Sequence, residues 1–234
     1  MNDLGGKTAS GAAWSVAAQV ARQAILLISN VVLARLLAPE DFGVVATALI
    51  FINFALIIGE QGFGSALVQR KDVTEEHLSS VFWLYAVMGL LLAGFFQWAA
   101  PRIADFYHEP RLTGVIRIIS GVFVLNSLAI VPTNILSRAM QFRPLAKVEV
   151  AGAWIGGLSA IALAWWGLGV RSIAIQAVIA ASAGLLMLMV VNPWRPRLLF
   201  SWRAIGDLAG FSTNLFVGNV MNYGERNVDN LLIG

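Results

Sequence analysis

Residues 80–100 read SVFWLYAVMGLLLAGFFQWAA, a stretch without an acidic or basic side chain. A helix needs about 20 mainly apolar residues to cross the hydrocarbon core of a bilayer. This stretch is long enough for one crossing. Trp83 and Trp98 stand near its two ends, where a belt of aromatic rings at the membrane surface is expected. The stretch therefore predicts a transmembrane helix.

Similar apolar runs occur along the whole chain. The predicted spans cover residues 12–34, 43–66, 80–100, 113–135, 148–168, 171–191 and 208–232. Of the 234 residues, 58% are hydrophobic and 12% are charged, whereas a soluble domain carries about 25% charged residues. Strands are not expected, because isolated strands leave backbone groups unpaired in lipid. The sequence predicts an all-α integral membrane protein and excludes a disordered chain.

Lysine and arginine are unevenly distributed between the predicted loops. Those in the amino-terminal tail and the even-numbered loops are Lys7, Arg70, Lys71, Arg138, Arg143, Lys147, Arg195, Arg197 and Arg203. Those in the odd-numbered loops are Arg35, Arg102, Arg111 and Arg171. Cytoplasmic loops carry the excess of positive charge, so the amino terminus is predicted to be cytoplasmic. The net charge of +3 is too small to indicate a nucleic-acid partner.

Polar side chains recur at helical spacing inside several predicted spans. A charge at mid-bilayer costs about 2.5–3.5 kcal/mol on insertion scales, so it normally faces a cavity or a partner. We therefore expect a hydrated, partly cationic path between the helices, with Arg22 at its centre. The candidate lining residues are Gln19, Arg22 and Gln23 in the first span, Asn53 and Glu60 in the second, Arg117 in the fourth, and Arg226 and Asp229 in the seventh.

Each of these residues also has a simpler interpretation. Single serines or asparagines in membrane helices often join neighbouring helices by hydrogen bonds. Arg117 lies near a span end, from which its guanidinium can reach the membrane surface. Glu60 precedes a Gly-Phe-Gly turn and a charged loop, so it can lie at the interface. Arg22 is harder to explain in this way, because it lies near the middle of its span.

Other motifs give weaker signals. Glu40 and Asp41 precede a predicted helix, where the helix dipole favours acidic side chains. His77 and His108 fall in loops predicted on opposite sides of the membrane, so they form no metal site. Gly152 and the glycine four residues later have the GxxxG spacing of closely packed helices. The chain has no cysteine, nucleotide-binding loop or zinc motif, and no cofactor or metal is expected.

The loops carry a series of recognisable motifs. Residues 33–43 read LARLLAPEDFG, and residues 62–69 read GFGSALVQ. IADFY follows at 103–107, VPT at 131–133, RAMQFR at 138–143 and NVDNLLIG at 227–234. In this order, over nearly the whole chain, they resemble the Wzx-type polysaccharide flippases of the multidrug/oligosaccharidyl-lipid/polysaccharide exporter superfamily.

This resemblance implies a transporter of the bacterial inner membrane rather than an enzyme. Its fold would consist of two six-helix bundles around a cavity that opens alternately to each side. Its substrate would be an oligosaccharide repeat unit on an undecaprenyl pyrophosphate carrier, and a polysaccharide polymerase is an expected partner. Arg22 and Arg117 would then contact the anionic head, Gln19, Gln23 and Asn53 would bind sugar hydroxyls, and Arg226 and Asp229 would pair or form a gate.

Flippases of this type are roughly twice as long as this chain, as expected for a fold built from repeats. Residues 1–200 are therefore expected to form the amino-terminal six-helix bundle, and residues 201–234 a linker and the first helix of the second bundle. Three other functions stay open: an ion-coupled multidrug exporter, a membrane glycosyltransferase or polymerase that uses Asp41, and a non-transporting fragment with a scaffolding role.

Overall fold

In the computed structural model, the described residues are 2–59, 63–70 and 72–208. Within them the chain forms helices and no strand, which confirms the all-α prediction for this part of the molecule. The helices are α1 (Asn2–Leu36), α2 (Pro39–Gly59), α3 (Phe63–Gln69), α4 (Glu75–Phe106), α5 (Arg111–Arg138), α6 (Phe142–Trp165) and α7 (Arg171–Val191).

Five stretches in the described part are long and apolar enough to cross a membrane. They are residues Val16–Leu36 of α1 and the whole of α4, α5, α6 and α7. They correspond to five of the seven predicted spans. The seventh predicted span, 208–232, lies outside the described residues apart from its first residue.

The predicted span 43–66 has the wrong boundaries. The helix that covers most of it, α2, begins at Pro39 and ends at Gly59, and a separate helix, α3, begins at Phe63. In α3, Phe63 and Leu67 are buried together with residues of α4 and α5. The apolar run 43–66 thus contributes to two helices in the described part of the chain, and the second packs against α4 and α5.

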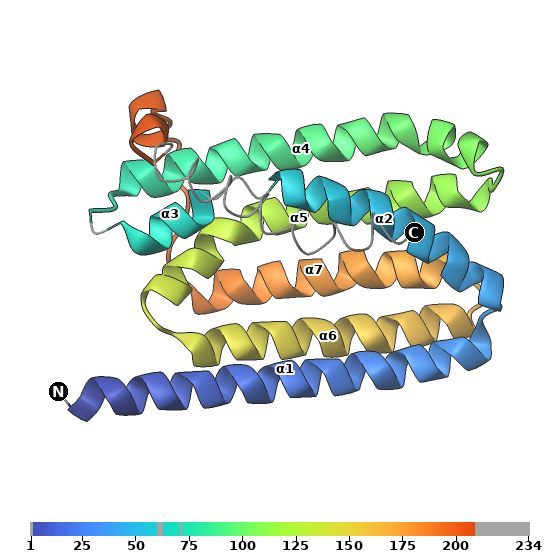
Figure 1. Cartoon of the computed structure of the whole chain (residues 1–234), viewed down its shortest axis with the longest axis horizontal. Helices are drawn as coiled ribbons and strands as arrows, with labels where there is room; N and C mark the ends of the chain where they lie inside the picture. The colour runs from blue at the N-terminus through green and yellow to red at the C-terminus, as the bar shows by residue number, and fades with distance from the viewer. Residues whose placement is uncertain (1, 60–62, 71, 209–234) are drawn as a thin grey trace, which may run out of the picture.

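The long helices lie side by side, and their connections gather at two ends (Figure 1). The α3–α4 and α5–α6 loops lie at one end with the start of α1 and the segment after α7, and the α1–α2, α4–α5 and α6–α7 connections lie at the opposite end. The first end contains most of the loop arginines: Arg70, Arg138, Arg143, Arg195, Arg197 and Arg203. We call it the basic end. The loops thus alternate as the charge pattern predicts.

Local chemistry explains where α4 begins. Thr74 is the amino-terminal cap: its hydroxyl accepts from the backbone N–H of His77, and its own N–H donates to the His77 ring Nδ1. This reciprocal pair satisfies donors that a helix start leaves unpaired. At its other end, α4 continues through Pro101 to Phe106. The predicted boundary at Pro101 is therefore wrong, because the helix accommodates one missing N–H.

Small residues allow the helices to pack closely. Gly157 of α6 lies against Ser29 of α1, and a Cβ atom added at Gly157 would clash with the serine Oγ. A Cβ added at Gly156 would be 2.8 Å from the Cβ of Ala180 in α7. One added at Gly89 of α4 would be 2.8 Å from a backbone oxygen of α5. Such contacts are typical of helix packing in membranes, and they confirm the packing interpretation of the GxxxG motif.

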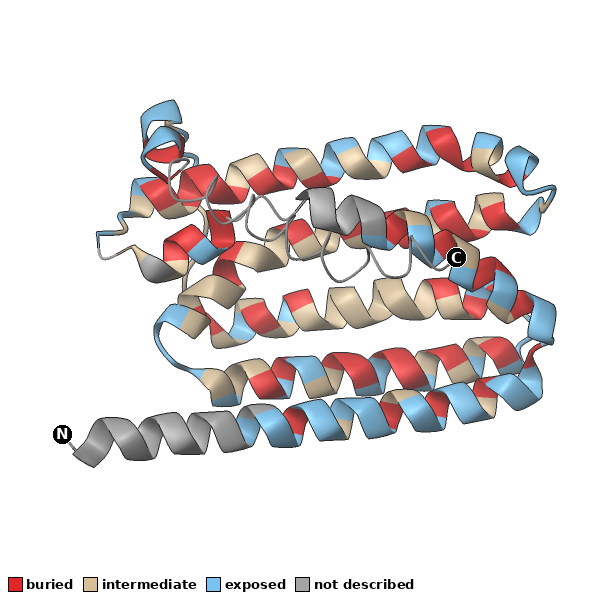
Figure 2. Ribbon diagram, viewed as in Figure 1, coloured by how far each residue is buried: buried red, intermediate tan, exposed pale blue. Residues whose placement is uncertain are grey.

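Large apolar side chains remain exposed on the outer surface of the bundle. From residue 16 onward, α1 is mostly exposed (Figure 2), with Leu27 and Ile28 more than 60% exposed. Leu91 in α4 and Val190 in α7 are exposed as well. A soluble protein rarely leaves so many large apolar side chains in water, whereas lipid solvates them without penalty.

The segment after α7 is fixed to the start of α4. The backbone N–H groups of Arg197 and Ser201 donate to the hydroxyls of Ser79 and Ser80, at 3.2 and 2.9 Å. Trp194 Nε1 donates to the carboxylate of Glu75 at 3.0 Å. Further along, residues 202–208 are helical, and two apolar side chains of this turn are buried against α3, α4 and α5. The chain therefore returns across the basic end instead of leaving the bundle.

Candidate functional site

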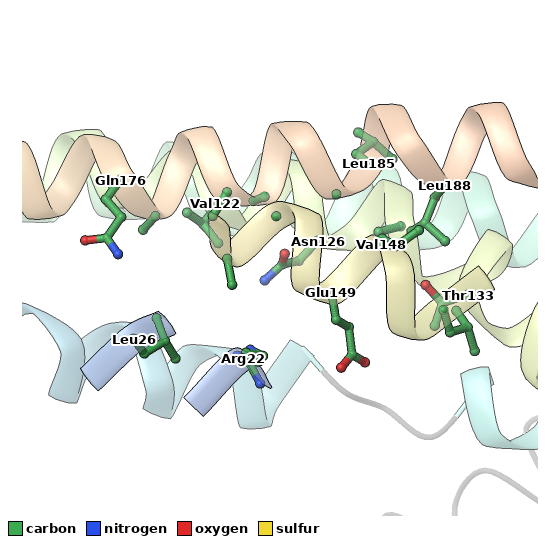
Figure 3. Close-up of a pocket in the computed structure, with 18 residues that line it drawn as sticks. Arg22, Leu26, Val122, Asn126, Thr133, Val148, Glu149, Gln176, Leu185 and Leu188 are labelled. Atoms are coloured by element: carbon green, nitrogen blue, oxygen red, sulfur yellow. The ribbon is translucent and has the colours of Figure 1, made fainter. Parts of the chain in front are cut away.

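A cavity of about 420 Å³ lies between α1, α5, α6 and α7 (Figure 3). Its lining includes two charged side chains, Arg22 of α1 and Glu149 of α6. Three further polar side chains line it: Asn126 and Thr133 of α5 and Gln176 of α7. The rest of the lining consists of apolar or small residues, among them Gly152, Ala153, Ala177, Ala180, Ala181 and Gly184. The cavity thus combines one cation, one carboxylate and several hydrogen-bonding groups.

Helix packing brings the two charges to the same level of the bundle. α1 and α6 run in the same direction, and Ser29 lies against Gly157. Two turns earlier on each helix, the same alignment brings Arg22 level with Glu149. Glu149 lies seven residues after Phe142, about 10 Å along α6 from its start. Arg22 therefore lies nearer to the basic end than the predicted central position.

Side chains from three helices converge on the Arg22 side of the cavity. In Figure 3, Asn126, Glu149 and Gln176 all point toward the side on which Arg22 lies. Arg22 and Glu149 are both exposed rather than buried in the helix packing. Small residues of α6 and α7 form part of the lining between these helices. A ligand in the cavity would meet donors and acceptors from every surrounding helix.

The sequence-predicted site residues are only partly brought together. Arg22 lines this cavity, and Gln19 lines an adjoining hollow of about 390 Å³ whose lining also includes Glu149. Gln23, Asn53 and Arg117 are exposed and do not belong to the lining of either hollow. The remaining predicted residues, Glu60, Arg226 and Asp229, lie outside the described part of the chain.

Two buried serines of α5, Ser120 and Ser127, face α4 rather than the cavity. Ser120 accepts a hydrogen bond from Gln97 Nε2 of α4 at 2.9 Å and donates to the backbone oxygen of Arg117 at 2.7 Å. Ser127 lies against Gly89 of α4. For these serines, the interpretation as groups that join neighbouring helices agrees with the structure. Arg117 lies six residues after the start of α5, about 9 Å along the helix.

Glu149 is the residue that changes the electrostatics of the site. The sequence led us to expect a partly cationic path, but Glu149 balances the formal charge of Arg22 within this lining. The sequence did contain a signal for this residue, because Glu149 is an isolated acidic residue one position inside the predicted span 148–168. Asn126 and Gln176 were also missed, because single amides do not form a stripe.

A second charged cluster lies at the end opposite the basic end. Arg111 donates through Nη1 to Asp41 at 3.0 Å and through Nε and Nη2 to the two carboxylate oxygens of Glu109, at 2.8 and 3.0 Å. The hydrogen bonds and charge of Arg111 lower the pKa of Glu109 below its ordinary value. Asp41 is nearly buried at the start of α2. Its carboxylate therefore connects the start of α2 to the α4–α5 turn.

The two histidines are at opposite ends of α4. His77 lies in its first turn, and His108 lies in the turn after it. With a rise of about 1.5 Å per residue, a helix of this length separates its ends by more than 40 Å. The described residues contain no group of three or more histidine, aspartate or glutamate side chains placed to hold a metal ion.

These features define a class: a helical protein that crosses a membrane several times and keeps a polar cavity between its helices. The chain belongs to the polysaccharide biosynthesis protein family, whose model matches residues 32–234. This match confirms the resemblance to polysaccharide flippases at the level of the family.

Named relatives agree with this assignment. The chain is 32% identical to the succinoglycan biosynthesis transport protein ExoT of Rhizobium meliloti (strain 1021), over 90% of this chain and 42% of that protein. It is 28% identical to the teichuronic acid biosynthesis protein TuaB of Bacillus subtilis (strain 168), over 96% of this chain and 47% of that protein. It is 25% identical to the lipopolysaccharide biosynthesis protein WzxC of Escherichia coli (strain K12), over 97% of this chain and 46% of that protein.

The chain thus spans less than half the length of these curated relatives. No solved structure matches it.

Proposed function

We propose that the chain takes part in polysaccharide export across the bacterial inner membrane. In this proposal it forms the amino-terminal lobe of an alternating-access transporter that moves undecaprenyl-pyrophosphate-linked repeat units to the periplasmic leaflet. Residues 1–200 would be the first helical bundle, and residues 201–234 would begin the second. The names of the relatives, which concern the biosynthesis of succinoglycan, teichuronic acid and lipopolysaccharide, support the substrate class.

The observation that carries the proposal is Arg22 in a cavity formed by four helices. A guanidinium forms strong, charge-assisted hydrogen bonds with phosphate oxygens. A cation placed between membrane helices is costly unless it serves a partner or a substrate. The amides and the Thr133 hydroxyl that share the lining match the hydroxyl groups of a sugar. The proposal also keeps the predicted roles of the other candidate residues. These are Gln19, which lines the adjoining hollow, and Gln23, Asn53, Glu60, Arg117, Arg226 and Asp229.

The proposed orientation follows from the basic end. Cytoplasmic loops are richer in lysine and arginine than external loops. If the basic end is cytoplasmic, Arg22 and Glu149 lie closer to the cytoplasmic leaflet, in which the lipid-linked repeat unit is assembled. A polymerase on the other side of the membrane would then receive the product.

The test is the Arg22→Gln variant in cells whose polysaccharide export depends on this protein. Losing one charge-assisted contact costs about 1.5–3 kcal/mol, so we expect export to fall by about 10–100-fold. Lipid-linked repeat units should accumulate at the cytoplasmic face. Arg35→Gln is the matched control, because Arg35 lies on the same helix outside the cavity lining. Normal export by Arg22→Gln at normal protein level would refute the role of Arg22.

One observation supports a second candidate within transport. An ion-coupled exporter of small molecules is expected to carry an acidic residue in its cavity, and Glu149 is such a residue. This candidate predicts that Glu149→Gln abolishes efflux of organic cations, while polysaccharide export does not depend on the protein. Measuring both activities in the same strain separates the two functions.

A glycosyltransferase or polymerase would need Asp41 for its chemistry. In the structure, the carboxylate of Asp41 pairs with Arg111, which supports a structural role. If the Asp41→Asn variant assembles polymer normally, the result supports the transporter function. If the variant folds but no longer assembles polymer, the result supports the enzyme function. A scaffolding role predicts that both Asp41→Asn and Arg22→Gln leave export unchanged.

A further inference from the structure

The cavity contains its own counter-charge to Arg22. Glu149 lines both the main cavity and the adjoining hollow that Gln19 also lines. Among the described residues that line either hollow, Arg22 and Glu149 are the charged ones. They come from different helices, α1 and α6, and share one space between the helices (Figure 3). Each is therefore the nearest opposite charge that the lining offers to the other.

Two opposite charges that line the same cavity attract each other. Charges between membrane helices are screened less than charges in water, because the surroundings have a low dielectric constant. An anionic group that approaches Arg22 meets two effects of Glu149. The carboxylate repels the anion directly, and it also attracts the guanidinium that the anion must engage. Both effects weaken the binding of an anion.

We propose that Glu149 competes with an anionic headgroup for Arg22 and thereby sets the affinity of the cavity for phosphate-bearing lipids. This inference rests on the proposed function, because it takes a lipid phosphate as the ligand of Arg22. When the headgroup enters, its phosphate engages Arg22 against the attraction of the Glu149 carboxylate. When the headgroup leaves, Glu149 again neutralises Arg22.

This competition has a consequence for transport. A cavity that held a phosphate with an unopposed guanidinium would bind it tightly and release it slowly. A resident carboxylate stabilises the empty cavity, so that the free energy difference between the loaded and empty states becomes smaller. Glu149 would then favour release, while Arg22 favours loading. The amides of Asn126 and Gln176 carry no net charge and do not affect this balance.

The experiment measures binding of undecaprenyl phosphate to the full 234-residue chain in lipid nanodiscs. Neutral undecaprenol is the matched probe without charge. We expect Glu149→Gln to bind undecaprenyl phosphate about tenfold more tightly than the unchanged chain, with no change for undecaprenol. Glu76→Gln is the control variant, because Glu76 is an exposed carboxylate at the start of α4, outside both linings. It should bind like the unchanged chain.

The variants also separate this inference from the proposed function. If the unchanged chain and Arg22→Gln bind the phosphate equally, the proposed role of Arg22 fails. If binding depends on Arg22 but Glu149→Gln binds no more tightly, the competition alone is refuted. The effect of Glu149→Gln should largely disappear when Arg22→Gln is added, and a tightening that persists in full would also refute it. If Glu149→Gln does not fold, Glu149→Ala serves with the same expectations.

Discussion

The contact between α6 and α7 gives a sharp test of the packing. A Cβ atom added at Gly156 lies 2.8 Å from the Cβ of Ala180, whereas carbon atoms prefer to be about 3.5–4.0 Å apart. A methyl group cannot rotate out of this contact, so the helices must separate. Overpacking of this kind costs about 1–3 kcal/mol, and the better helix propensity of alanine returns up to about 1 kcal/mol.

We therefore expect Gly156→Ala to lower the free energy of unfolding by about 1–2 kcal/mol. The midpoint of thermal unfolding should fall by about 2–8 °C for a chain of this size. The measurement is thermal unfolding in detergent micelles, followed by tryptophan fluorescence. Gly94→Ala is the control, because a Cβ added there has no atom within 4 Å. It should leave the midpoint unchanged or raise it.

A compensating exchange makes this test more specific. Ala180→Gly alone should cost about 1 kcal/mol through helix propensity. In the double variant, one methyl group moves from α7 to α6, and the remaining contacts of the new Cβ are 3.3 Å or longer. We expect the double variant to be within about 1 kcal/mol of the unchanged chain, a coupling typical of residues in contact. If the two effects simply add, the close contact between α6 and α7 is refuted.

Two further predictions concern the two ends of the bundle. Arg111 lowers the pKa of Glu109, so the stability from this pair is complete above the ordinary glutamate pKa and is lost as the pH falls through the lower folded-state pKa. Glu109→Gln should therefore flatten this part of a plot of unfolding free energy against pH. An unchanged plot would contradict the pairing. Trp194→Phe removes the hydrogen bond from the indole to Glu75. Trypsin should therefore cleave the segment after α7 faster in this variant than in the unchanged chain. Equal cleavage rates would show that this bond does not fix the segment.

Much of the fold was predictable from sequence, because lipid restricts the possible structures. Apolar runs of sufficient length must be helical in a membrane, and five of the predicted spans match helices of the described part. The predicted boundaries were less accurate. Phe63 and Leu67 belong to a separate helix that packs against α4 and α5, and Pro101 lies within α4 rather than at its end.

The candidate site was predictable only in part. Arg22 was singled out because a charge within an apolar helix is costly, and it does line the cavity. Glu149 was missed because its meaning depends on α6 packing beside α1, and this contact joins residues far apart in the chain. The serines of α5 recur at helical spacing, as Gln19, Arg22 and Gln23 of α1 do, yet they face α4. Spacing identifies a shared face, but it does not identify the neighbour of that face.

The sequence by itself determined the class of protein, the alternation of its loops and the likeness to its family. These properties follow from hydropathy, from charge asymmetry and from local motifs, all of which are written along the chain. Only the tertiary structure decided that Arg22 shares a cavity with Glu149, that Asp41 pairs with Arg111 and that the segment after α7 returns to α4. These are contacts between distant segments, and they depend on how the helices pack.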